Sequence, residues 1–153
     1  LLSRGFSIAE LAQIIAIYPS VWGLSQLFTG KLADKFPKKT LLFWGMFVQG
    51  LAILGFIWAQ TFFAFAALSV MLGLGTAVVY PTFLAAIADN THPSQRAQSI
   101  GVYRLWRDLG YAVGAILTGL LADFWSVNTA IFAIGSITVL SALVIQLRMR
   151  PVS

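Results

Sequence analysis

Long apolar runs, separated by short polar stretches, make up most of this 153-residue chain. A helix needs about 20 predominantly apolar residues to cross a bilayer core of roughly 30 Å. The five runs that come near or above this length cover about residues 8–30, 41–58, 62–88, 98–122 and 127–147. Pro19 and Pro81 lie inside two of the runs, and each is expected to bend its helix. The pattern predicts an all-α membrane protein with five transmembrane helices.

Composition supports a membrane protein and excludes several other classes. Hydrophobic residues form 59% of the chain and charged residues 10%, whereas soluble domains carry about 25% charged residues. The basic residues cluster at the ends of the apolar runs, which is typical of membrane proteins and not of a nucleic-acid-binding face. The chain has no cysteine and one histidine, His92, so no metal site is expected. Because no catalytic triad, phosphate-binding glycine loop or HExxH motif is present, neither an enzyme nor a cofactor is expected.

Basic residues are distributed unevenly between the two ends of the predicted helices. Arg4 lies at one end, and the other end holds Lys31, Lys35, Lys38, Lys39, Arg96, Arg148 and Arg150. Because cytoplasmic loops carry the excess of Lys and Arg, we expect the loop of residues 30–39 and the C-terminus to be cytoplasmic. The N-terminus would then lie outside. Since the chain has neither an initiator methionine nor a signal sequence, we expect at least one further spanning helix upstream.

Three charged residues, Arg104, Arg107 and Asp108, lie deep within the predicted helix 98–122. A charged side chain at the bilayer centre costs at least about 2.5–3.5 kcal/mol. Helical spacing places Arg104, Asp108 and Tyr111 along one face, which should therefore be turned toward protein or a water-filled cavity. Two interpretations stay open. The face could serve a solute or proton pathway, with Asp108 as a candidate protonation site, or an Arg104–Asp108 pair could lock helices together or close a gate.

Uncharged polar and aromatic side chains extend this candidate site. Trp22 and Gln26 are one turn apart in the first predicted helix, and Tyr80 precedes Pro81 in the third. Together with Tyr111, these residues are candidates to line a cavity. The alternative is ordinary packing, because polar side chains also form hydrogen bonds between membrane helices.

Two helix ends share a short pattern that indicates an internal repeat. The segments Thr29–Asp34 and Thr118–Asp123 match at five of six residues. In the predicted orientation they end on opposite membrane faces, as inverted repeats of three helices would. Chance similarity between two helix ends rich in small residues is the alternative.

The loop of residues 30–39, called the lysine loop below, resembles a signature of the major facilitator superfamily. That signature lies between the second and third helices and again between the eighth and ninth, and the residues that match it in register are Gly30, Leu32, Ala33, Asp34, Lys35, Lys38 and Lys39. Residues 18–26 and 101–111 are similar to the eighth and eleventh helices of bacterial members. The resemblance implies helices eight to twelve of the C-terminal half, with the N-terminal half and the seventh helix missing.

The resemblance also implies a function. It indicates a secondary transporter of the cell (plasma or inner) membrane that moves a small organic solute by alternating access, coupled to protons, together with its N-terminal half. Gly30 would permit close helix approach, Asp34 would accept bonds from the start of helix 98–122, and the three lysines at 35, 38 and 39 would complete a gating network. Pro37 stands where the family has glycine and cannot adopt a positive φ, so the loop must turn differently. The alternative function is a non-transporting membrane scaffold or receptor subunit.

Overall fold

The computed structural model describes residues 5–149. The regular elements in this range are helices, and no strand is among them. The five long helices are α1 (Ile8–Thr29), α3 (Lys38–Gly55), α4 (Phe62–Asp89), α5 (Arg96–Phe124) and α6 (Val127–Arg148). Two short elements connect them: α2 (Leu32–Lys35) and the 3-10 helix η2 (Pro93–Gln95). The long helices begin and end within three residues of the five predicted segments.

Three of these helices, α1, α4 and α6, are long and apolar enough to cross a membrane. The two others carry charges that lower their hydropathy. Helix α3 has 18 residues and begins with Lys38 and Lys39, and α5 holds Arg104, Arg107 and Asp108 near its middle. The chain is thus an all-helical protein with three helices of membrane-spanning character, and spanning by α3 and α5 stays a prediction.

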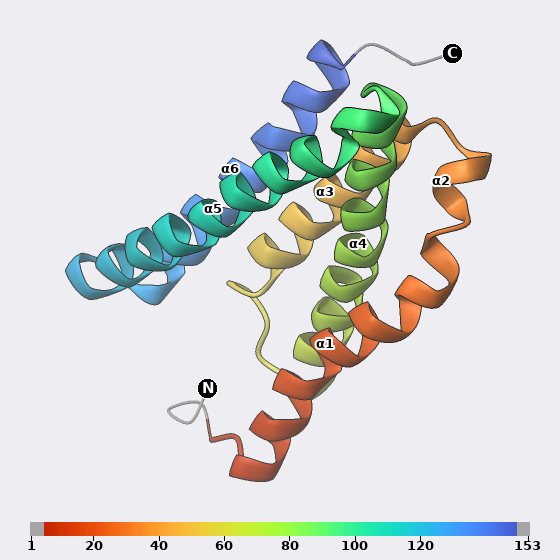
Figure 1. Cartoon of the computed structure of the whole chain (residues 1–153). Coiled ribbons are helices and arrows are strands. Elements are labelled where there is room, and N and C mark those ends of the chain that lie inside the picture. Colours follow the sequence, from red (N-terminus) through yellow and green to blue (C-terminus); the bar gives the residue numbers. More distant parts are fainter. Residues whose placement is uncertain (1–4, 150–153) are drawn as a thin grey trace.

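The long helices run alternately in opposite directions (Figure 1). Helices α1, α4 and α6 run upward in that view, whereas α3 and α5 run downward. Helix α3 packs against both α4 and α6, and α4 also packs against α1. The pair formed by α5 and α6 diverges from the lower ends of α1 and α4. Within the described chain, α5 has no buried residue.

Glycines bring the central helices close together. A Cβ atom added to Gly75 of α4 would lie 2.8 Å from the carbonyl oxygen of Gly45 on α3. On the other side of α3, a Cβ atom on Gly50 would lie 3.2 Å from the carbonyl oxygen of Gly135 on α6. Only glycine allows backbones to approach this closely, as is common between membrane helices. These contacts hold α4, α3 and α6 together.

A buried hydrogen bond compensates for the proline inside α4. Pro81 has no N–H group, so the carbonyl of Ala77, four residues earlier, lacks its usual helical donor. The hydroxyl of Thr29 at the end of α1 donates to that oxygen, with an Oγ1–O distance of 2.8 Å. Leaving a buried acceptor unsatisfied costs about 1–3 kcal/mol. The bond therefore stabilises α4 at Pro81 and fixes the end of α1 against it, next to the lysine loop.

Candidate functional site: a lysine loop and a polar contact between α4 and α5

The lysine loop is attached to the end of α4. Lys38 forms an ion pair with Asp89, the last residue of that helix. Pro37 caps α3 with φ −56°, a value that proline favours, and it precedes the helical turn without losing a hydrogen bond. The loop thus turns at Pro37 in a conformation that proline suits, where the family signature has glycine.

Two other members of the predicted gating motif lack the contacts that the resemblance implies. Gly30 is in right-handed helical conformation, and its nearest neighbour for an added Cβ is the carbonyl of Gln26 in its own helix, at 4.0 Å. The expected close approach of another helix is therefore not present in the described chain. Asp34 is exposed and has no hydrogen bond or ion pair with any described residue. Its bond to the start of α5 stays a prediction.

The charged residues of α5 are organised around Arg107. Its Nε and Nη2 atoms each lie 2.9 Å from Oδ1 of Asp108. The same guanidinium lies 5.2 Å from the ring centre of Tyr80 on α4, a cation–π distance. Arg107 therefore connects the Asp108 carboxylate to α4, and we call these three residues the α5 polar contact.

The predicted Arg104–Asp108 pair is not formed. Arg104 is exposed and makes no ion pair within residues 5–149. The spacing of four residues makes that pair sterically available on a helix. The carboxylate instead pairs with the neighbouring Arg107, which Tyr80 holds from the side of α4.

A second aromatic contact, which the sequence analysis did not identify, lies one turn away from the α5 polar contact. The rings of Phe83 on α4 and Tyr103 on α5 have centres 5.7 Å apart. Tyr103 precedes Arg107 by four residues and Phe83 follows Tyr80 by three, so helical spacing could have indicated both. These rings border a hollow of about 590 Å³ between the two helices. Its lining consists of Phe83, Ala86, Ile87, Asn90, Thr91, Gln98, Ser99, Val102 and Tyr103.

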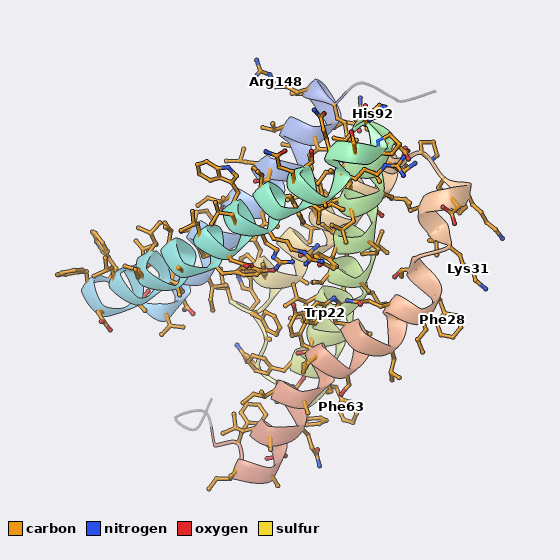
Figure 2. All side chains as sticks on the ribbon, viewed as in Figure 1. Trp22, Phe28, Lys31, Phe63, His92 and Arg148 are labelled. Carbon is orange, nitrogen blue, oxygen red and sulfur yellow. The ribbon has the colours of Figure 1, made fainter. Side chains whose placement is uncertain are left out.

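The remaining candidates, Trp22, Gln26 and Tyr111, have no hydrogen bond or ring contact with the α5 polar contact. Trp22 lies where α1 passes α4 (Figure 2) and stacks on Tyr18, with ring centres 6.2 Å apart. Its indole Nε1 is buried and has no acceptor among the described residues. Gln26 and Tyr111 are exposed. Their role in lining a cavity therefore stays a prediction.

Acidic and imidazole side chains do not gather into a metal site. Within residues 5–149, no three His, Cys, Asp or Glu side chains lie close enough to hold an ion. The ion pairs of this part of the chain lie in the α5 polar contact and at the lysine loop.

Apolar helices of spanning length, together with a charged pair inside a further long helix, are features of integral membrane proteins. The family model of the Major Facilitator Superfamily matches residues 2–153. The chain belongs to this superfamily. The family indicates a transporter and not an enzyme.

Several curated relatives are transporters by name. The chain is similar to an uncharacterized MFS-type transporter of Methanocaldococcus jannaschii, at 23% identity over 94% of this chain and 37% of that protein. It matches the inner membrane transport protein YnfM of Escherichia coli at 24% identity, over 91% of this chain and 33% of that protein. The methyl viologen resistance protein SmvA of Salmonella typhimurium is 32% identical over 81% of this chain and 26% of its own length. The chain thus spans about a third of the length of these relatives.

Proposed function

We propose that this chain forms most of the C-terminal half of a secondary active transporter, which moves a small organic solute by alternating access and is coupled to protons. The α5 polar contact is the observation that carries this proposal. An Arg and an Asp within a membrane helix are costly and usually lie on an ion or solute pathway. In this chain, Arg107 follows Arg96, the first residue of α5, by eleven residues, or about 16 Å at 1.5 Å per residue.

The alternating helix directions support five spans. Helices α1 and α4 both end beside the lysine loop, as the Lys38–Asp89 pair requires. The chain must therefore return to the opposite end through α3, and again through α5 before α6. At 1.5 Å per residue, the 29 residues of α5 reach about 44 Å, more than a bilayer core. With the excess of basic residues at the end that holds the lysine loop, we place that loop and the C-terminus in the cytoplasm.

The exposed face of α5 supports a missing helix and a missing half. Added Cβ atoms on Gly110 or Gly114, which are one turn apart on α5, would meet nothing within 4 Å, unlike those on the central helices. We propose that the seventh helix of the transporter packs here, and that the solute site lies between this half and the N-terminal half. The inverted three-helix repeats that we propose would relate α3 to α6, and these two helices pack against each other.

Proton coupling would act through Asp108. A proton and Arg107 compete for the same carboxylate, so protonation would release the guanidinium from Asp108 and leave it at Tyr80. That release would change the charge balance of the α5 polar contact at each turnover, while Arg107 stays beside Tyr80. Such a step would couple proton binding to the net charge that α5 presents beside α4.

Replacing Asp108 by Asn should therefore uncouple transport from the proton gradient. In proteoliposomes of the complete transporter, we expect Asp108→Asn to lose gradient-driven accumulation while solute exchange without a gradient continues. Methyl viologen, the compound in the name of one relative, is the first solute to test. Asp123→Asn, an equal charge change at the far end of α5, is the matched control. Undiminished accumulation by Asp108→Asn would exclude the proton-carrier role.

A further inference from the structure

The lysine loop and the end of α6 together enclose a small hollow. Residues 33–39 and Met149 line it, and its volume is about 290 Å³. Its lining residues lie between the end of α1 and the start of α3 and just after the end of α6. Since α1 and α6 are of spanning character, the hollow lies where the apolar segments give way to polar ones.

The charges around the hollow do not cancel. Lys38 is neutralised by its ion pair with Asp89. Lys35 and Lys39 have no acidic partner among the described residues, and Asp34 supplies one opposing carboxylate. Lys31, which lies outside the lining, is also exposed and unpaired in the described chain. The hollow is therefore positive, and an anion is the complementary ligand.

Apolar side chains border the same cations. Phe36 lies between Lys35 and Pro37 and is 54% exposed, and Met149 closes the hollow from α6. A free inorganic anion gains nothing from such surfaces. A phospholipid offers both a phosphate for the lysines and a glycerol and acyl region for the aromatic ring, which favours the membrane interface.

We infer that this hollow binds the headgroup of an anionic phospholipid, with Lys35 and Lys39 at its phosphate and Phe36 beside its glycerol region. Basic residues next to membrane helices attract anionic lipid at about 1 kcal/mol each. The bound lipid would attach the lysine loop to the membrane surface through Lys35 and Lys39, whereas Lys38 attaches the loop to α4. This inference concerns lipid binding alone and does not depend on transport.

Native mass spectrometry of the purified 153-residue chain tests the inference, with phosphatidylglycerol and phosphatidylcholine of equal chain length as probes. We expect the chain to retain phosphatidylglycerol preferentially. The Lys35→Gln/Lys39→Gln variant should lose about 25-fold in phosphatidylglycerol affinity, at about fivefold per lysine. The Lys35→Arg/Lys39→Arg variant keeps both charges and should stay within about twofold of the wild type.

Asp34→Asn gives the opposite sign, because removing the one carboxylate at the hollow should strengthen phosphatidylglycerol binding. If the variants only disturbed the structure of the loop, phosphatidylglycerol affinity would not rise and fall with the charge of the loop. Equal binding by the wild type and the double Gln variant would overturn the inference. So would displacement of the lipid by inorganic phosphate at equal concentration, because it would show a simple anion site. Since the measurement is not of flux, either failure would leave the transport proposal standing.

Discussion

Replacing Gly75 by valine is expected to separate α3 from α4 and to destabilise the chain severely. A Cβ atom at this position would lie 2.8 Å from the carbonyl oxygen of Gly45 and 2.8 Å from the side chain of Gln49. The Gly45 oxygen is backbone and can move only if the whole helix moves. Overpacking of this kind costs about 1–3 kcal/mol or more, out of a typical total of about 5–15 kcal/mol. Thermal unfolding in detergent, followed by helical circular dichroism, measures the loss.

The matched control is Gly114→Val on α5, where an added Cβ meets nothing within 4 Å. This variant should leave the unfolding temperature of the 153-residue chain nearly unchanged. In the complete transporter, the same substitution should destabilise, because the proposed seventh helix packs against that face. Equal stability of the Gly75→Val and Gly114→Val chains would show that the α3–α4 approach is not as close as described.

The second large effect is expected from Arg107→Gln in the complete transporter. The substitution removes both bonds to the Asp108 carboxylate and the cation beside Tyr80. Hydrogen bonds to charged groups contribute about 1.5–3 kcal/mol, so losing them should slow solute flux roughly ten- to hundredfold. The initial rate of uptake into proteoliposomes, at equal protein level, measures it.

Arg104→Gln is the control for Arg107→Gln. It removes the same charge about one turn away, and Arg104 has no ion pair in the described chain. We expect a smaller loss of flux from this variant. If the two variants behave alike, net charge in the cavity matters and the specific contact with Asp108 and Tyr80 does not.

The positions of the helices could be predicted because bilayer thickness fixes the length of an apolar segment. Charged residues mark the ends of the apolar runs. One run gives way to another between Lys35 and Lys38, and again between Asp89 and Arg96, close to where the helices end and begin. The lysine loop could be recognised because its residues are contiguous in the chain. Local information of this kind is present in the sequence itself.

Contacts between helices were harder to predict. Spacing on α5 alone made Arg104 a candidate partner for Asp108, but Arg107 forms the pair, and Tyr80 on α4 lies beside its guanidinium. The Lys38–Asp89 pair joins residues 51 positions apart, and nothing local marks it. The same limit applies to Thr29, whose bond to Ala77 depends on where α1 crosses the bend at Pro81.

The central claim is that the polar face of α5 lines a water-filled path through the membrane. The chain has no cysteine, so single-cysteine variants of it can be labelled without background. Tyr111 and Val113 lie at nearly the same depth on opposite faces of α5, and both are exposed. In intact membranes containing the complete transporter, otherwise free of cysteine, a membrane-impermeant thiol reagent should label Tyr111→Cys rapidly and Val113→Cys slowly. Equal labelling rates at the two positions, or faster labelling at Val113→Cys, would contradict the account.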